Sequence, residues 1–276
     1  MTLPFKTALS ALTVAATLVC APLAHARDGV AALSEALLLP EVVALLKEEG
    51  LRYGASLDED VLSGTGGQYF ADQVAQIYDT DLMLQVLQDM LSDGLDEEEI
   101  ADSVAFFDTD SGQRILQLEV SARKAMNDPT IDEIAEDAWR AAEADADARF
   151  SAVLNFIDIN DLNERNVTGA LSSNYQFFRG LVEGGSHQMS EDEMLGEVWA
   201  QEEDIRSETS TWLKSFLFMA YSPLSDDEMA AYLDYSDSGA GQALNAALFD
   251  GFDEMYRDIY FALGLAVAEA LQASEL

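Results

Sequence analysis

Apolar residues recur at helical spacing along nearly the whole chain beyond Ala26. The clearest stripe advances in steps of three and four residues, which keep its members on one face of a helix. It consists of Phe249, Phe252, Tyr256, Ile259, Leu263 and Val267. Similar stripes run through Val42–Leu51, Val74–Leu91, Ile131–Phe150 and Met194–Tyr221. The alternating β-branched runs typical of strands are missing from the sequence. It therefore predicts an all-α protein.

Start signals and breaks divide this helical pattern into elements. Asp96–Glu99 and Ser225–Glu228 each place a capping residue three positions before a glutamate, which predicts two capping boxes. Pro40 and Pro129 stand where prolines of a first helical turn belong. Breaks are predicted at Ser63–Gly67, Asn127–Pro129, Asn160–Asn166 and Gly184–His187.

The two capping boxes belong to segments that match at one constant offset. Leu95–Ile115 aligns without a gap with Leu224–Leu244. The shared motif comprises Glu99, Phe106, Asp108, Gly112 and Gln113 in the first copy, and Glu228, Tyr235, Asp237, Gly241 and Gln242 in the second. Outside the motif the same offset pairs Phe70 with Trp199, Leu84 with Leu213, Met90 with Met219, and Met126 with Met255. The sequence therefore predicts an internal duplication, with a first helical repeat at 27–155 and a second at 160–276 packed into a bundle-like array.

The two copies read DEEEIADSVAFFDTDSGQRIL and SDDEMAAYLDYSDSGAGQALN. In its acidic helix start, aromatic residue, Ser/Thr-rich turn and glycine, each copy resembles the bacterial domain-of-unknown-function family 2059. The resemblance is carried by these two stretches, and both lack the proline usual in that turn. It implies two tandem copies of a helical, exported envelope protein. The family has no established activity and supplies no catalytic residues.

The motif has a structural interpretation as a corner between two helices. In the first copy a helix is predicted to end at Phe106 or Phe107, and Asp108 and Ser111 to cap the helix that follows. Gly112 would let the two helices approach closely and would tolerate a positive φ. Phe106 would fill the space between them, and the second copy is expected to repeat the arrangement.

The segment at 1–26 has the order of a secretory signal peptide. Lys6 precedes an apolar run at Ala8–Val19, and the small-residue site Ala24–Ala26 follows. The run is shorter than the roughly 20 residues of a membrane span, and acidic residues interrupt every later apolar stretch. Lipidation at Cys20 is disfavoured, because a valine precedes it. The sequence predicts a periplasmic or secreted protein, cleaved after Ala26, with no transmembrane span.

Composition narrows the chemistry that remains after cleavage. The whole chain has 14 basic and 52 acidic residues, a net charge of −38, yet 49% of its residues are apolar, which excludes disorder. Loss of Lys6 leaves 13 basic residues and a net charge of −39, which excludes nucleic-acid binding. Cys20 and His25 leave too, so the mature chain has no thiol and a single imidazole, His187. Disulfides, thiol nucleophiles and Cys-ligated zinc are excluded, and no cofactor or resident metal is predicted.

Three local patterns suggest ligand sites, and each has a simpler interpretation. Asp108–Gly112 with Glu119 resembles half of a calcium loop, but Gln113 stands where that loop needs glycine. A capped helix corner is favoured, and weak association of divalent cations with the acidic surface stays open. Ser63–Gln68 is glycine-rich but lacks the lysine and the preceding strand of a P-loop. His187 is predicted to lie exposed in a loop, because no G-x-S-x-G motif accompanies it.

Carboxylate pairs and aromatic residues leave two functional hypotheses open. Pairs of acids could serve a hydrolase, but in so acidic a chain most are expected on solvated helix faces. Tyr175, Phe177 and Phe178 are too close in sequence to point inward together, so they form a candidate partner surface, although core packing is favoured. The favoured function is a non-catalytic exported protein that binds or supports an unidentified envelope protein or polymer. The alternative is a carboxylate-dependent hydrolase acting on an extracellular polymer.

Overall fold

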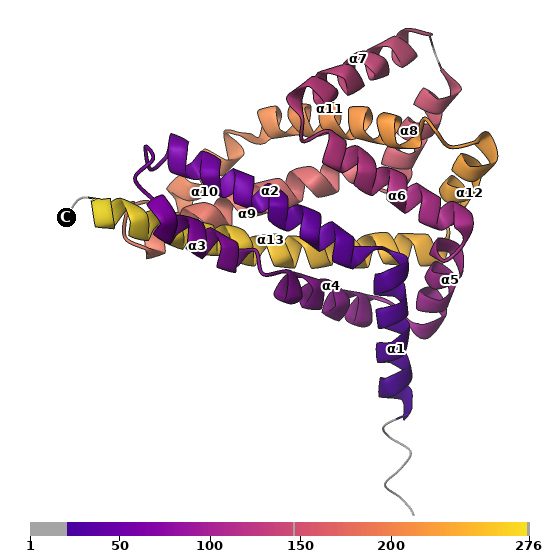
Figure 1. Cartoon of the computed structure of the whole chain (residues 1–276), viewed down its shortest axis with the longest axis horizontal. Coiled ribbons are helices and arrows are strands. Elements are labelled where there is room, and N and C mark those ends of the chain that lie inside the picture. Colours follow the sequence, from indigo (N-terminus) through magenta and orange to yellow (C-terminus); the bar gives the residue numbers. More distant parts are fainter. Residues whose placement is uncertain (1–20, 146, 275–276) are drawn as a thin grey trace, which may run out of the picture.

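The computed structural model describes residues 21–145 and 147–274 of the 276-residue chain, and every regular element in these ranges is an α-helix (Figure 1). The predicted all-α class is confirmed. The predicted signal peptide lies outside the described residues, apart from the backbone of residues 21–26, which begins the first helix. The helices are α1 (Ala21–Ala36), α2 (Leu39–Asp60), α3 (Gly67–Ile77), α4 (Thr80–Gly94), α5 (Glu97–Phe107), α6 (Asp110–Ala125), α7 (Pro129–Asp145), α8 (Ala148–Ile159), α9 (Leu162–Glu183), α10 (Glu191–Trp199), α11 (Glu202–Tyr221), α12 (Asp226–Ser236) and α13 (Gly239–Ser274).

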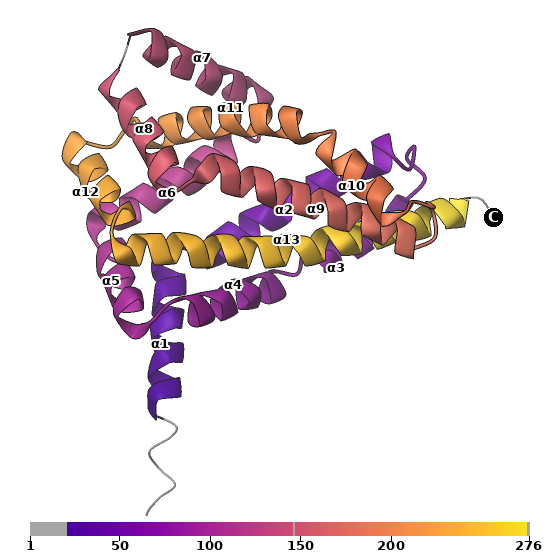
Figure 2. The ribbon, with the colours of Figure 1, turned by 180° about the vertical axis from the view of Figure 1, so that it is seen from behind.

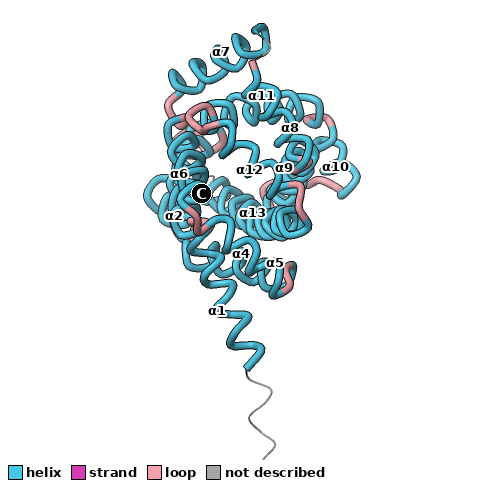
Figure 3. Tube along the Cα trace, turned by 90° about the vertical axis from the view of Figure 1, so that its right-hand side faces the viewer, coloured by secondary structure: helices cyan, strands magenta, loops and turns pink. Residues whose placement is uncertain are grey.

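The long helices define the shape of the molecule. Helices α2, α9 and α13 follow its long axis, α4 lies on one side of α13, and α11 lies on the other (Figures 1 and 2). Helix α13 has 36 residues and packs most extensively on α9 and α4. Seen along the long axis, most helices overlap in one bundle, from which α1 and α7 project (Figure 3).

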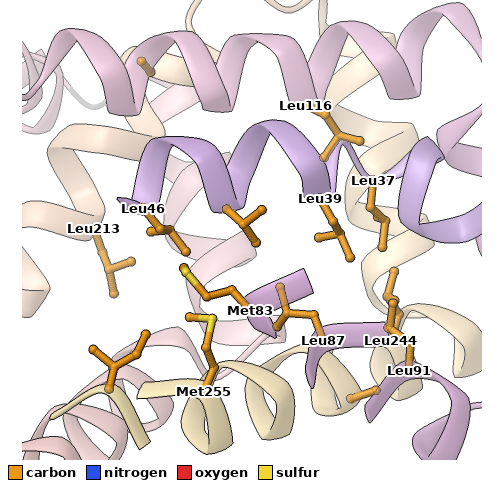
Figure 4. Packing of buried hydrophobic residues seen from close by; sticks show 14 of the residues in the cluster. Leu37, Leu39, Leu46, Met83, Leu87, Leu91, Leu116, Leu213, Leu244 and Met255 are labelled. Carbon is orange, nitrogen blue, oxygen red and sulfur yellow. The ribbon is translucent and has the colours of Figure 1, made fainter. Parts of the chain in front are cut away.

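One apolar core joins the two ends of the sequence. Leucines of α2 and α4 meet residues of α11 and α13, as Leu39, Leu87, Leu213 and Met255 show (Figure 4). Because the most deeply buried side chains come from both predicted repeats, the core belongs to the whole chain. The close crossing of α9 and α13 depends on glycine, since a Cβ on Gly180 would lie 2.9 Å from the Cα of Gly264.

The predicted helix starts agree with the structure. Asp96 Oδ1 accepts hydrogen bonds from the backbone N–H of Glu98 and Glu99, both at 2.9 Å, and Glu99 Oε2 accepts from the N–H of Asp96 at 2.8 Å. Ser225 and Glu228 form the same reciprocal box at the start of α12. Such boxes satisfy backbone N–H groups that the first turn would otherwise leave without partners.

Three of the four other stripes each extend over two helices. The stripe at Val74–Leu91 breaks at Asp79, whose side chain caps α4. The other two divide between α7 and α8 and between α10 and α11. The first two stripes continue through their breaks because both helices of each pair place apolar residues in the same core. In the third, α11 contributes to that core, whereas α10 buries Met194 and Val198 outside it. The break predicted at Asn160–Asn166 is also shorter than expected, since α9 begins at Leu162.

Within the described residues, no single helix is both long enough and apolar enough to cross a membrane. Asp28–Ala36 and Leu39–Asp60 satisfy the length and composition requirement only when taken together, and a bend of 60° separates them.

Candidate functional site at the paired helix corners

The first copy of the repeated motif forms the corner between α5 and α6. Thr109 caps α6: its Oγ1 donates to the carbonyl oxygen of Phe106 at 2.7 Å and accepts from the N–H of Gly112 at 3.0 Å. The expected caps, Asp108 and Ser111, are therefore wrong. Thr109 takes this position because it has the extended backbone of an N-cap, with φ −76° and ψ 158°, whereas Asp108 still has helical torsions.

The side-chain amide of Gln113 links the first corner to α1 through hydrogen bonds. Its Nε2 donates to the carbonyl oxygen of Phe107 at 2.9 Å, at the end of α5, and to that of Ala36 at 2.7 Å, the last residue of α1. One amide thus satisfies carbonyl groups at two helix ends, which would otherwise need water. The motif glutamine therefore joins three helices.

The second corner, between α12 and α13, has the same hydrogen bonds. Ser238 Oγ donates to the carbonyl oxygen of Tyr235 at 2.6 Å and accepts from the N–H of Gly241 at 3.1 Å. Gln242 Nε2 donates to the carbonyl oxygen of Ser236 at 2.7 Å and to that of Ile159 at 3.1 Å. Ile159 is the last residue of α8, as Ala36 is of α1. Asp237 follows α12 as Asp108 follows α5.

The motif glycines are required for space. A Cβ on Gly112 would lie 2.5 Å from the carbonyl oxygen of Phe106, and a Cβ on Gly241 would collide with the carbonyl oxygen of Tyr235. Neither glycine has a positive φ, so the conformational freedom that was expected to matter is not used. Close approach of consecutive helices is the reason for glycine here.

The order of helices repeats beyond the corners. Helices α2 and α9 have 22 residues each, and each follows a residue with left-handed torsions, Leu38 at φ 54° and Asp161 at φ 51°. Contacts among α1 to α6 have counterparts among α8 to α13, with α7 as the connection. The expected equivalence of Phe70 and Trp199 is wrong, because Phe70 is 1% exposed and Trp199 is 64% exposed. The buried residue of α10 in that place is Met194.

The two corners meet through equivalent aromatic residues. The rings of Phe106 and Tyr235 stack with centroids 4.3 Å apart and planes inclined by 8°. Tyr235 also donates its hydroxyl to Ser103 Oγ at 2.8 Å. Burial, together with nearby Asp102, raises the pKa of Tyr235 to about 12. Each of these rings was expected to fill the space within its own corner. In the first corner the buried residue is Phe107 instead, and Phe106 contacts Tyr235 of the second corner.

A groove of about 770 Å³ lies where the corners meet. Stacked Phe106 and Tyr235 form its aromatic part, and carboxylates of α5 and α12 surround them. Its lining comprises Asp96, Glu98, Glu99, Asp102, Phe106, Ala231, Asp234, Tyr235, Ser238, Gly239 and Ala240, with no Lys or Arg in this set. The groove thus combines an apolar surface with concentrated negative charge. Asp108 and Gln113 of the motif line a separate cavity of about 200 Å³ beside α1.

The two motif glutamates differ in charge partners. Glu228 accepts from Arg114 at 2.9 Å, and Arg114 also donates to the carbonyl oxygen of Pro223 at 2.7 Å. Hydrogen bonds from Ser225 and then Arg114 lower the pKa of Glu228. The position equivalent to Arg114 in the second half is Ala243, which cannot pair with Glu99. Within the described residues Glu99 has no ion pair, and its Oε2 accepts from the backbone N–H of Asp96.

Glu119 belongs to a polar cluster with two tyrosines. It was considered as the last ligand of a calcium loop, but its Oε1 accepts from the hydroxyls of Tyr221 at 2.7 Å and Tyr232 at 3.2 Å. Burial raises the pKa of Glu119, and the two phenols act in the opposite direction. The cluster joins α6 of the first half to α11 and α12 of the second. In residues 21–145 and 147–274 no group of three or more His, Cys, Asp or Glu could hold a metal ion.

The remaining candidates lie apart from the groove lining. Tyr175, Phe177 and Phe178 of α9 are half-buried: the two phenylalanines pack against the core, and the Tyr175 hydroxyl donates to Glu191 Oε1 at 3.2 Å. Their role as a partner surface stays a prediction. His187 lies exposed in the loop before α10, with Nδ1 3.1 Å from Ser186 Oγ.

Residues 81–140 match a family described as an uncharacterised protein conserved in bacteria (DUF2059). The matched range contains α5, α6 and the whole first corner, so it agrees with the resemblance of the first motif copy. The second corner lies outside it. No curated protein and no solved structure matches the chain.

Proposed function

We propose that this chain is an exported, non-catalytic helical protein of the bacterial envelope that binds a partner in the groove between the two corners. The groove is the observation that supports this function. It lies where both motif copies meet, it has the volume typical of ligand sites, and it combines stacked rings with free carboxylates. The matched family, described only as conserved in bacteria, agrees with a bacterial origin.

We also propose that the chain arose by duplication of one helical unit. The support is the equivalence of hydrogen bonds at the two corners, where each donor and acceptor within the first corner recurs at the same sequence offset in the second. The bonds of Gln113 and Gln242 to the ends of α1 and α8 extend the equivalence to six helices. Duplication explains why two related surfaces meet at one groove.

Export is the part of the proposal that rests on the sequence. The charged, apolar and small-residue segments of residues 1–26 support it. Fractionation of the native cells should place the protein in the periplasm or medium, and sequencing of the mature N-terminus should begin at Arg27. A chain retained in the cytoplasm with residues 1–26 intact would refute export.

Partner binding can be tested with a photo-crosslinking residue placed in the groove. Ala231 is exposed and lines the groove, whereas Ala138 is exposed on α7, outside the groove lining. Benzoylphenylalanine at position 231 should give a discrete crosslinked product in intact cells, and the same residue at 138 should not. Absence of a groove-specific product from a folded, exported protein would overturn the proposal. Mature protein should release no product from peptidoglycan or model glycans, since we propose no catalytic activity.

A further inference from the structure

We infer that the groove accommodates a positively charged peptide segment of the partner, with an apolar or aromatic side chain against Phe106 and Tyr235. This inference rests on the proposed function and names the chemistry of the occupant. It requires two properties of the groove at once, unpaired negative charge and an accessible apolar surface. Both are present in the described residues.

The negative charge of the groove is available to a ligand. Glu98, Asp102 and Asp234 are exposed, and none of their carboxylates has a hydrogen bond or an ion pair within residues 21–145 and 147–274. They belong to α5 and α12, so the charge comes from both sides of the groove. A guanidinium or ammonium group arriving there would form charge-assisted hydrogen bonds without displacing an existing partner.

The aromatic pair supplies the second part of the recognition. Phe106 and Tyr235 are half-buried, so part of each ring remains accessible to a ligand. The accessible ring surface can receive an apolar side chain, and it can also attract a cation through its π electrons. A peptide that combines Lys or Arg with an aromatic or aliphatic residue matches both features. A purely ionic ligand would leave the ring surface exposed to water.

Charge disfavours other occupants. A second copy of this chain would bring another net charge of −38, and nucleic acids or anionic lipids would bring phosphates toward the same carboxylates. A divalent ion needs several acids gathered as ligands, and the described residues contain no such group. A basic segment of a protein is the occupant whose charge and shape fit.

The experiment compares two variants that remove the same number of charges. Glu98→Gln/Asp102→Asn/Asp234→Asn removes three carboxylates from the groove and leaves both capping boxes intact. The control removes three exposed, unpaired glutamates elsewhere: Glu133→Gln/Glu143→Gln/Glu208→Gln. Both variants keep equal net charge, so diffuse attraction to the protein is matched between them. Circular dichroism should confirm that both are folded.

The probe is a fluorescent nonapeptide that alternates lysine with tryptophan and leucine, and its binding is measured by anisotropy. We expect the groove variant to weaken binding about tenfold and the control variant less than about twofold, because only the groove charges contact the peptide. Ala231→Trp should weaken binding by occluding the groove, and Ala138→Trp should not. A version with glutamine in place of lysine should bind poorly.

Other results would overturn the inference. Equal weakening by both triple variants would mean diffuse electrostatic attraction. Undiminished binding of the glutamine peptide would mean an apolar site, and displacement of the lysine peptide by millimolar calcium but not by sodium of equal ionic strength would mean a cation site. If the crosslink from position 231 forms equally well in the groove variant, the proposed function stands and the basic occupant is wrong. If the peptide binds but no cellular crosslink forms, the envelope partner is wrong instead.

Discussion

Phe106 and Tyr235 come from opposite halves of the sequence and stack on each other with their centroids 4.3 Å apart. They occupy the same position in the two copies of the motif, so each copy contributes one ring to the same contact. The adjacent hydrogen bond from Tyr235 to Ser103 adds a polar link between the same helices, α12 and α5. The contact therefore holds the two corners together and shapes the groove between them.

The stacked pair should show energetic coupling. Phe106→Ala should lower the free energy of unfolding by about 2 kcal/mol, less than a fully buried phenylalanine would, because Phe106 is half-buried. In a double-mutant cycle with Tyr235→Ala, the two losses should be non-additive by about 0.5–1.5 kcal/mol. Urea denaturation of the four proteins measures this. Trp199→Ala, at an exposed position, should be additive with Phe106→Ala, and additivity of the stacked pair would refute the coupling.

The three glycines of the corners should respond differently to alanine. Gly112→Ala and Gly241→Ala should each destabilise the protein by about 1–3 kcal/mol, because the new Cβ would meet backbone atoms that cannot move aside. Gly239→Ala is the matched control, since no atom lies within 4 Å of its Cβ position in α13. It should stabilise the helix by about 0.4–1 kcal/mol. Thermal and urea denaturation distinguish these signs, and a neutral Gly112→Ala would contradict the packing explanation.

Local patterns in the sequence were sufficient to predict the fold class and both capping boxes. A box depends on residues three positions apart, as in Asp96 and Glu99, and needs no tertiary information. The same holds for the constant offset between the motif copies, which aligned the corners correctly. It failed at Phe70 and Trp199, because α11 has 20 residues and its counterpart α4 has 15, so the offset that holds at the corners does not extend back to α3 and α10.

Contacts between the two halves could not be predicted from local sequence patterns. One of them, the contact of Glu119 with Tyr221, is nevertheless indicated by the position of Glu119 in the sequence. Glu119 lies in the apolar stripe that runs through α6 with buried Ile115, Ala122 and Met126. Because an acid on such a face is costly to bury alone, its position indicates a hydrogen-bond partner in the core. Which partner could not be predicted, since Tyr221 is 102 residues away. The groove was missed for the same reason, because its two sides come from opposite halves of the sequence.

The melting temperature should rise with salt concentration. The chain has a net charge of −38, and its acids lie on helices in both halves, so they repel one another in the folded state. The screening length falls from about 30 Å at 0.01 M to about 3 Å at 1 M salt, which removes most of this repulsion. Circular dichroism melts in sodium chloride test this. Glu133→Gln/Glu143→Gln/Glu208→Gln should melt higher at low salt and show a smaller salt response. A flat response of the native protein would contradict the prediction.

The pH dependence of stability should carry the signature of Glu119. Burial raises its pKa above the ordinary value of 4.5, so the folded protein holds this proton more tightly than the unfolded chain. The contribution of Glu119 to stability is therefore fully present below pH 4.5 and is lost as the pH rises through the raised pKa. Glu119→Gln keeps an oxygen that accepts from Tyr221 and Tyr232 and carries no charge. It should be at least as stable as the native protein at pH 7, with a smaller advantage at pH 4.

A control with the opposite sign is available in the same molecule. Hydrogen bonds from the backbone and side chain of Ser190 lower the pKa of Glu193, so its contribution is present at neutral pH and is lost on acidification through the lowered value. Glu193→Gln should therefore be less stable than the native protein at pH 7 and approach it as the pH falls. Urea denaturation from about pH 3 to pH 8 compares the three proteins, so that the range extends well below the ordinary pKa of 4.5. If Glu119→Gln lost stability equally at every pH, the hydrogen-bond geometry of the carboxylate, and not its charge, would control the Glu119 cluster.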